Sequence, residues 1–243
     1  MQMTLLEMVQ SILSDLDSED VNSISDTIEA EQIASVVRDT YYNIIAGREF
    51  PEHEQLLKLT ALSDSSYPTH MSLPDTVRRI DKVWYNVSTD GGVEFRELRW
   101  VDPDRFLNLY VEGDNTTQIS DKNSGSIYLV GNDAMPTYFT SFDNYYIVMD
   151  SHDSTVDTTL QASKSRCRGL VYPDFTISDS FVADLDMNWF PYLLAEAKSA
   201  CFSIFKSGAD PKVDQAARRL KSYLQNDRYR TKQENKRPHY GRR

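Results

Sequence analysis

Apolar residues recur at helical spacing near both ends of the sequence, whereas the long stretch between them has the shorter period of β-strands. This change of period constrains the fold strongly, because a pattern of one period cannot bury its apolar face in the other kind of element. The order of helices, strands and helices predicts an α+β chain. Its 243 residues are enough for one large domain or two small ones.

The N-terminal segment predicts two helices joined by an acidic loop. Residues 4–16 place apolar side chains three and four apart, and Asp17-Ser18-Glu19-Asp20 then breaks the pattern. Thr27 is the predicted N-cap of the second helix, and Gly47 is its predicted end. The apolar stripe of this helix comprises Ile28, Ile33, Val36, Val37, Tyr41, Ile44 and Ile45.

The middle of the sequence, after Pro51, predicts a β-rich region. Thr89-Asp90-Gly91-Gly92 supplies the glycines that a tight hairpin turn needs. Asp102-Pro103 predicts the start of one short helix within this region, with Phe106, Leu107 and Tyr110 on its apolar face. The predicted strands lie at residues 56–60, 79–85, 93–98, 126–130, 137–142 and 145–150, with a last one within 155–172.

The helical period returns at Asp186 and predicts two more helices. The first tolerates Pro191 because a proline in the first turn removes no helical hydrogen bond, and Gly208 is its predicted end. The second begins at Asp210-Pro211. The apolar positions are Trp189, Leu193, Leu194, Ala197, Cys201, Ile204 and Phe205 in the first, and Val213, Ala216, Ala217, Leu220, Tyr223 and Leu224 in the second.

Neither helical pair is long enough to form a core easily by itself. We therefore predict a discontinuous α-helical bundle domain, in which the N-terminal pair packs on the C-terminal pair and the β-rich region is an insertion. Its predicted core includes Leu13, Val37, Leu194 and Cys201. The predicted divisions are 1–50 for the helical hairpin, 51–185 for the β-rich inserted domain, 186–226 for the C-terminal helices and 227–243 for an extended basic arm.

Charge is distributed unevenly along the chain, whose formal net charge is −11. From Met1 to Glu31 there are eight carboxylates and no Lys or Arg, which gives −8. From Lys212 to Arg243 there are eleven bases and three acids, which gives +8. Such opposite ends indicate an acidic body with a basic segment that binds a partner.

Histidines and cysteines show no ligand spacing that predicts a metal or cofactor site. His53 and His152 lie in short acidic triplets, which fit a metal or acid–base cluster but are also common in polar loops. Cys201 falls on an apolar helix face, whereas Cys167 lies between two arginines that would lower the pKa of its thiol. The acidic run from Asp15 lacks the central glycine of a calcium loop. We predict no enzyme activity and no cofactor.

The basic C-terminal segment gives the strongest functional indication in the sequence. Three interpretations fit its composition: a solubilising tail, a nucleic-acid-binding segment, and a segment that docks onto another protein. Tyrosine and arginine favour protein docking because they are common anchors in interfaces. The lack of an apolar run near twenty residues argues against a membrane span.

Three N-terminal stretches carry a family resemblance, namely Thr4-Leu5-Leu6-Glu7-Met8-Val9-Gln10-Ser11-Ile12-Leu13, Val21-Asn22-Ser23-Ile24 and Ala34-Ser35-Val36-Val37-Arg38-Asp39-Thr40-Tyr41-Tyr42. Together they resemble the opening of tailed-bacteriophage head-to-tail adaptors of the tail-tubular-protein-A type. The likeness is sharpest over roughly the first 45 residues. The order of helices, strands and helices and the C-terminal extension are similar to that family as architecture.

The resemblance implies a structural virion protein of the neck, assembled in the host cytoplasm. It implies a homo-oligomeric ring, typically a dodecamer, which sits beneath the portal protein, contacts a tail or nozzle protein, and lets packaged DNA pass without sequence-specific binding. Another neck, head-completion or tail component is an alternative, as is a β-domain module that binds a fibre or carbohydrate. The expected portal-binding residues are Arg228, Tyr229, Arg230, Lys236, Arg237, His239, Tyr240, Arg242 and Arg243.

Overall fold

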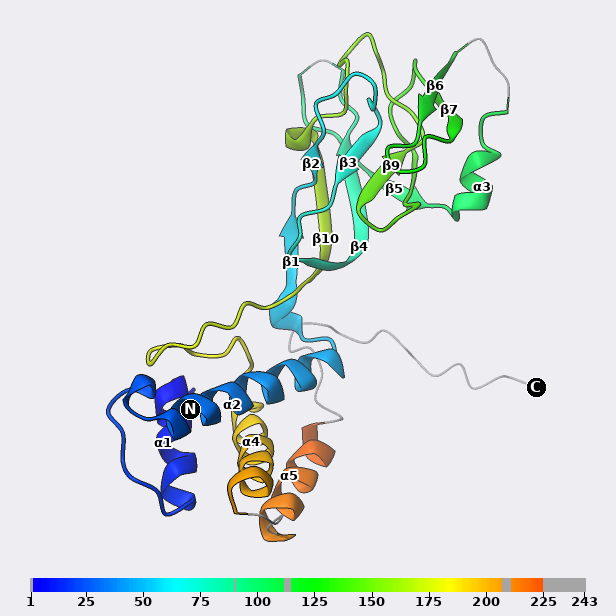
Figure 1. Cartoon of the computed structure of the whole chain (residues 1–243). Helices are drawn as coiled ribbons and strands as arrows, with labels where there is room; N and C mark the ends of the chain where they lie inside the picture. The colour runs from blue at the N-terminus through cyan, green and yellow to red at the C-terminus, as the bar shows by residue number, and fades with distance from the viewer. Residues whose placement is uncertain (1, 90, 112–114, 207–210, 225–243) are drawn as a thin grey trace, which may run out of the picture. The chain divides into compact units, whose positions relative to one another are not determined.

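A computed structural model describes residues 2–89, 91–111, 115–206 and 211–224 of the chain (Figure 1). The described residues form a mixed α/β structure with five α-helices and an eight-stranded sheet. Contacts divide the chain into two compact units. The helical unit comprises the described parts of Met1–His53 and Pro173–Arg243, and the sheet unit comprises those of Glu54–Tyr172.

The N-terminal part of the helical unit contains α1 (Leu5–Asp15) and α2 (Ile28–Ala46), which confirms both helices predicted there. Thr4 caps α1, because its hydroxyl accepts from the backbone N–H of Glu7 at 3.2 Å while the Glu7 carboxylate accepts from the Thr4 N–H at 2.7 Å. The predicted N-cap of α2 is also confirmed, since Thr27 accepts from the Ala30 N–H at 3.1 Å. These caps explain why the boundaries were predictable.

The C-terminal part contains α4 (Phe190–Phe205) and α5 (Pro211–Leu224), as the returning helical period predicts. Pro191 lies in the first turn of α4, where a proline is tolerated. α4 ends at Phe205, and the predicted helix end at Gly208 lies outside the described residues.

One hydrophobic core joins side chains from α1, α2 and α4, with Leu224 of α5 at its edge. The predicted core positions Leu13, Val37 and Cys201 are fully buried, at 1% exposure or less. Leu194 is only half-buried, and the fully buried leucine of this helix is Leu193. The prediction for Leu194 therefore needs correction: successive helical residues point about 100° apart, and the face of α4 toward the core runs through Leu193 and Cys201.

Four residues assigned to apolar helix faces lie outside the core: Ala216 of α5, Leu107 of the short helix in the β-rich region, and the helix-end residues Ile28 and Ile204. Ile28, the first residue of α2, is 76% exposed, and Ile204, near the end of α4, is 60% exposed. Both line a shallow groove of about 440 Å³ together with Val36 and Phe205. A stripe inferred from spacing includes helix ends that extend past the neighbouring helix, which explains the errors at Ile28 and Ile204.

The sheet unit contains an eight-stranded sheet with strand order β1-β10-β4-β5-β8-β9-β3-β2. The pairing of β5 with β8 is parallel, and the other pairings in this sheet are antiparallel. The strands are β1 (Glu54–Leu57), β2 (Thr60–Ala61), β3 (His70–Ser72), β4 (Val77–Asn86), β5 (Phe95–Trp100), β8 (Tyr138–Thr140), β9 (Tyr146–Met149) and β10 (Ser165–Val171). A separate hairpin pairs β6 (Thr116–Ser120) with β7 (Ile127–Gly131), and α3 spans Pro103–Leu107.

The boundary of the β-rich region differs from the predicted one, which placed residues 51–185 together. The sheet unit ends at Tyr172, and residues from Pro173 belong to the helical unit. Phe175 explains the difference, because its ring lies 5.3 Å from Tyr41 of α2 and 4.4 Å from Phe181. The segment has no helical period, so its aromatic side chains gave no sign of which core they join.

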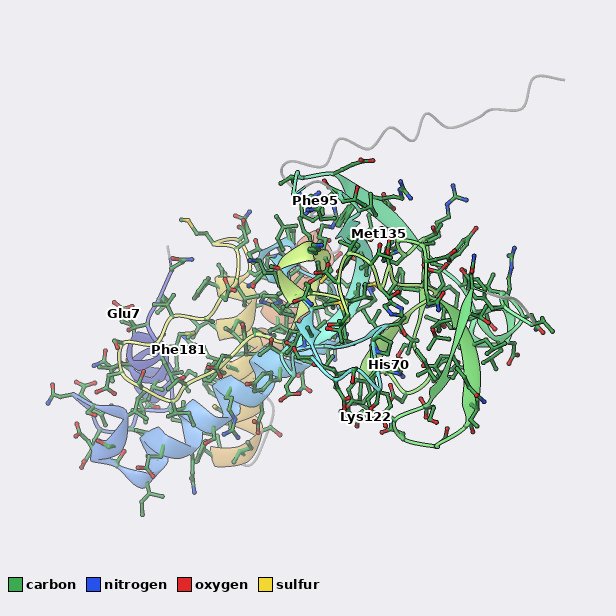
Figure 2. All side chains as sticks on the ribbon, turned by 90° about the horizontal axis from the view of Figure 1, so that it is seen from above. Glu7, His70, Phe95, Lys122, Met135 and Phe181 are labelled. Atoms are coloured by element: carbon green, nitrogen blue, oxygen red, sulfur yellow. The ribbon has the colours of Figure 1, made fainter. Side chains whose placement is uncertain are left out.

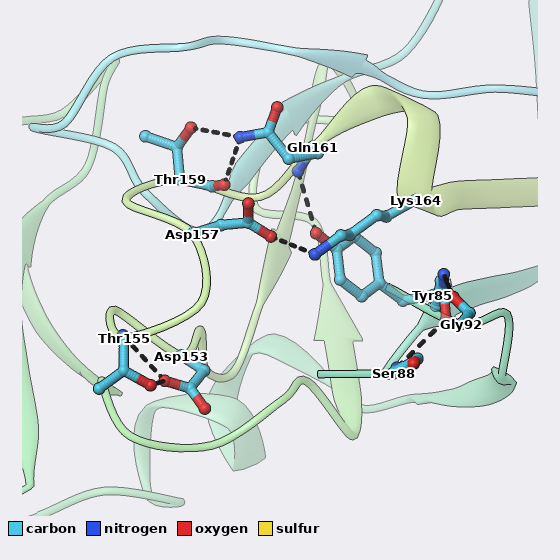
Figure 3. A network of polar contacts seen from close by, with 10 residues as sticks. Tyr85, Ser88, Gly92, Asp153, Thr155, Asp157, Thr159, Gln161 and Lys164 are labelled. Carbon is cyan, nitrogen blue, oxygen red and sulfur yellow. Dashed lines mark hydrogen bonds and ion pairs between the residues drawn. The ribbon is translucent and has the colours of Figure 1, made fainter. Parts of the chain in front are cut away.

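A polar network holds the loop before β10 against the sheet (Figure 3). The backbone N–H of Gln161 donates to the hydroxyl of Tyr85 at 3.0 Å, and the Gln161 amide donates to the Thr159 carbonyl at 2.8 Å. Lys164 forms an ion pair with Asp157 in the same loop. This loop therefore has defined contacts although it contains no strand.

Candidate functional site

The portal-binding residues predicted from the sequence lie outside the described residues. They are Arg228, Tyr229, Arg230, Lys236, Arg237, His239, Tyr240, Arg242 and Arg243. The last described residue before this basic segment is Leu224, at the end of α5. The candidate site therefore comprises the end of α5 and the residues that contact it.

Arg48 fixes the end of α5. Its Nη1 donates a hydrogen bond to the backbone carbonyl of Leu224, a helix-terminal group that lacks an intrahelical partner. The Arg48 guanidinium lies 4.8 Å above the ring of Trp189, the residue just before α4. A cation at a helix C-terminus also interacts favourably with the helix dipole. The end of α5 is thus tied to the residues that follow α2 and precede α4.

Aromatic side chains pack around Trp189, the ring that Arg48 contacts. Trp189 packs edge-on against Phe50 at 4.9 Å and against Tyr192 at 5.9 Å between ring centroids. Trp189 and Phe50 are both buried, at 8% and 1% exposure. Buried rings hold the guanidinium in one place, so the anchor of α5 belongs to the folded core.

A cleft of about 600 Å³ lies beside this anchor and is bounded by α2, α4 and α5. Its polar side chains have both signs of charge, with Arg48 and Lys221 as cations and Glu196 and Asp214 as anions. The Ser199 hydroxyl donates to the Asp214 carboxylate, which joins α4 to α5. Burial, with a smaller effect of the Glu196 charge, raises the pKa of Tyr192. The cleft also includes Thr40, Asn43, Ile44, Gly47, Ala200 and Ser203.

The chemistry of this cleft suits binding. Among its described lining residues there is no histidine or cysteine, and its serine–carboxylate contact lacks the imidazole that activates a serine nucleophile. Arginine, tyrosine and tryptophan near a cleft of mixed charge are typical of protein interfaces. The arrangement favours protein docking at the start of the basic segment.

The histidine triplets noted in the sequence do not form metal clusters. His53 is 2% exposed, and its Nε2 lies 3.0 Å from the backbone carbonyl of Asp184. His152 is 5% exposed, and burial lowers its pKa. Over the described part of the chain, no group of three or more His, Cys, Asp or Glu side chains could hold a metal ion.

The prediction of a lowered pKa for Cys167 is wrong. Cys167 is fully buried on β10, and burial raises the pKa of its thiol to about 11. Successive residues of a strand point to opposite faces, so Arg166 and Arg168 lie on the other side of the sheet. Cys201 is also buried, as its place on an apolar helix face indicates, and its pKa is raised to about 12.

A buried polar cluster around His70 was not predicted from the sequence. Nε2 of His70 lies 2.9 Å from the Tyr128 hydroxyl, and the ring of Tyr67 is 5.3 Å away. Lys122 lies 4.8 Å above the ring of Tyr146 at the edge of this cluster. Figure 2 labels His70 and Lys122 in the sheet unit. Burial lowers the pKa of His70 to about 4 and raises that of Tyr128. The neutral His70 thus connects β3 to β7 by a buried hydrogen bond.

This cluster predicts a loss of stability in mild acid. A histidine with a depressed folded-state pKa stabilises the fold above its ordinary value of 6.5, and this contribution is lost as pH falls toward about 4. The lost free energy of unfolding is at most about 3 kcal/mol. Urea unfolding at pH 7.5, 6 and 5 should show it, and His70→Gln should reduce the dependence. Parallel pH curves for both proteins would exclude His70 as the cause.

Comparisons with known proteins give no family for the chain. No protein-family model matches the sequence, and no curated protein matches it. Among the described helices, none is both long enough and apolar enough to cross a membrane.

Proposed function

We propose that the chain is a head-to-tail adaptor of a tailed bacteriophage, which forms a ring beneath the portal and connects the capsid to the tail. In this proposal the terminal helices form a discontinuous helical bundle domain in the wall of the ring, and the sheet unit is an insertion. The resemblance of the N-terminal stretches to such adaptors supports the family. The packing of both chain ends into one core fits the same architecture.

The anchored end of α5 is the observation on which this proposal chiefly depends. Arg48 donates a hydrogen bond to the carbonyl of Leu224, which fixes the end of α5 on the helical unit. The eighteen residues from Asn226 to Arg243 span at most about 60 Å when fully extended. Such a reach is enough to bridge to a neighbouring ring. Arms arrayed on one ring bind together with a high effective concentration even where each binds weakly.

Charge fits passage of DNA through the proposed ring. A subunit with a net charge of −11 repels phosphates, so a genome moves through the channel without binding to it. Portal and tail or nozzle proteins are the proposed partners. Packaged DNA is proposed to pass through the channel without sequence-specific binding. The location in this proposal is the neck of the virion.

The isolated protein is expected to be largely monomeric at moderate salt. Identical subunits with a net charge of −11 repel one another until a template orders them. Light scattering on dilute protein should give a mass near 27.9 kDa. A stable high-order ring that forms without portal would contradict this expectation.

Co-sedimentation with purified portal, and separately with DNA, tests the proposed function. An adaptor should sediment with portal and show little affinity for DNA. A nucleic-acid-binding protein should instead bind DNA, with an affinity that falls steeply as salt rises. Binding to a fibre or carbohydrate in place of portal would favour a β-domain module, and binding to a different neck protein would favour another structural component.

A further inference from the structure

The exposed face of β10, β4 and β5 combines cations with aromatic rings. Strand register places Arg166 opposite Trp84, and Arg168 opposite Lys82. Along the other edge of β4, where it pairs with β5, Asn86 lies opposite Phe95 on the same face of the sheet. The alternate residues Cys167, Val83 and Leu98 face the core. Lys82 and Arg166 are exposed, and Trp84, Phe95 and Arg168 are half-buried. We call these five residues the Arg166 face.

Arg166 is held between two rings on this face. Its guanidinium lies 4.3 Å from the ring centroid of Phe95 and 5.3 Å from that of Trp84. Stacking occupies the flat sides of a guanidinium but leaves its edge N–H groups able to donate to a carboxylate. Within the described residues no carboxylate lies at ion-pair distance from Arg166. The face thus presents a positioned cation with unused donors.

Two carboxylates on the same face argue against a nucleic acid as its partner. Glu97 lies 2.9 Å from Lys82, and Glu54 lies 3.8 Å from Arg168. These anions, in a chain of net charge −11, oppose the close approach of a phosphate backbone. Lys82 and Arg168 are thus already paired, and Arg166 is the cation of this face that has no carboxylate partner among the described residues. One positioned guanidinium flanked by aromatic rings can bind a short acidic segment of a protein.

The loop between α1 and α2 has the complementary charge. Glu19 and Asp20 are exposed, and Asp17 has 90% of its side chain exposed. Lys206 forms an ion pair with Asp17 at 3.3 Å. Among the described residues, Glu19 and Asp20 are therefore the loop carboxylates without an ion-pair partner. Ile28, at the start of α2 just after the loop, adds exposed apolar surface that aromatic rings can cover.

We propose that the Arg166 face of one copy docks onto the Asp17–Asp20 loop of a second copy of this chain. The two surfaces differ, so the contact is heterologous, and a heterologous contact repeats from subunit to subunit until a ring closes. The inference rests on the proposed function, because it specifies how the subunits of that ring recognise one another. Repulsion between whole subunits keeps the contact weak in dilute solution, and a portal template brings the two surfaces together.

Disulfide trapping between two full-length variants tests the proposal. One variant carries Arg166→Cys and the other Asp20→Cys, with different tags and mixed at high concentration under mild oxidation. The native cysteines Cys167 and Cys201 are fully buried and do not compete. Ser124→Cys, at an exposed position elsewhere on the sheet unit, replaces Arg166→Cys in the matched control. The mixed disulfide should exceed this control about tenfold and decline as salt rises.

A charge swap supplies the second measurement. Arg166→Glu should reduce carbodiimide cross-linking between isotopically light and heavy chains, and Arg166→Glu together with Asp20→Arg should restore it. A mixed disulfide no more frequent than the Ser124→Cys control would overturn the proposal. A variant that carries both Arg166→Cys and Asp20→Cys and forms only the disulfide within one chain would also overturn the proposal. Binding of duplex DNA to the Arg166 face, with no mixed disulfide formed, would overturn it as well.

Neither assay contains portal, so the proposed contact between copies and the proposed adaptor function can be refuted independently of each other. If the protein does not bind portal but forms the mixed disulfide, only the proposed adaptor function is refuted. A protein that binds portal but gives no mixed disulfide loses only this interface.

Discussion

Removal of residues 227–243 is expected to abolish attachment to portal while leaving the folded body intact. The deleted segment contains seven Lys and Arg residues against two acids, with two tyrosines and one histidine. Arginine forms charge-assisted hydrogen bonds with carboxylates, and tyrosine buries aromatic area, so this segment has the groups that docking requires. Co-sedimentation of full-length and truncated protein with portal measures the effect.

The melting temperature provides the control for this deletion. Leu224, the last described residue, retains its contact with Arg48 in the truncated protein, and no apolar stripe follows it in the sequence. The melting temperature should therefore change little. A full-length variant with Tyr229→Ala and Tyr240→Ala keeps the charge of the segment but loses its aromatic area. Weaker portal binding by this variant would show that charge alone does not cause attachment. Undiminished portal binding by the truncated protein would refute the docking role.

Leu13→Ala and Leu193→Ala are each expected to lower the free energy of unfolding by about 2–5 kcal/mol. Leu13 on α1 and Leu193 on α4 are at most 1% exposed and belong to the same core, so each substitution leaves a cavity there. Thermal unfolding should show both variants shifting one and the same transition. Leu194→Ala is the matched control, because Leu194 is half-buried and its truncation removes less packing.

The same pair of variants tests whether the two ends of the chain fold together. Val83→Ala, in the separate core of the sheet unit, provides a reference for the other transition. Independent transitions, one responding only to Leu13→Ala and the other only to Leu193→Ala, would mean that the two terminal segments belong to separate domains.

The helices were predictable because their information is local. Thr27 precedes an apolar stripe at helical spacing, and its hydroxyl caps α2 as expected. Spacing alone was less able to separate Leu193 from Leu194, since both fall on a broad apolar face. The choice between them depends on the direction from which α1 and α2 approach α4, and that direction is a tertiary property.

The sheet unit was harder to predict because its information is mostly non-local. β3 and β6 are short, and β6 has only Ile119 buried, so neither gives a clear alternation. His70 and Tyr128 meet across 58 positions of sequence, which spacing rules cannot detect. Cys167 is different: the alternation along a strand was visible in the sequence and would have placed its arginine neighbours on the opposite face.

The functional residues of the basic segment were inferred from charge and composition, and the structure adds the anchor at its start. Arg48 and Trp189 were not predicted as a pair, because a cation over a ring 141 positions away leaves no local signal.

Electron microscopy of the purified protein mixed with purified portal tests whether the chain is a head-to-tail adaptor. We expect a ring of additional density on one end of the portal, continuous with its channel and absent when residues 227–243 are deleted. Portal particles that remain bare at saturating protein, with the protein unbound or bound to DNA, would contradict it.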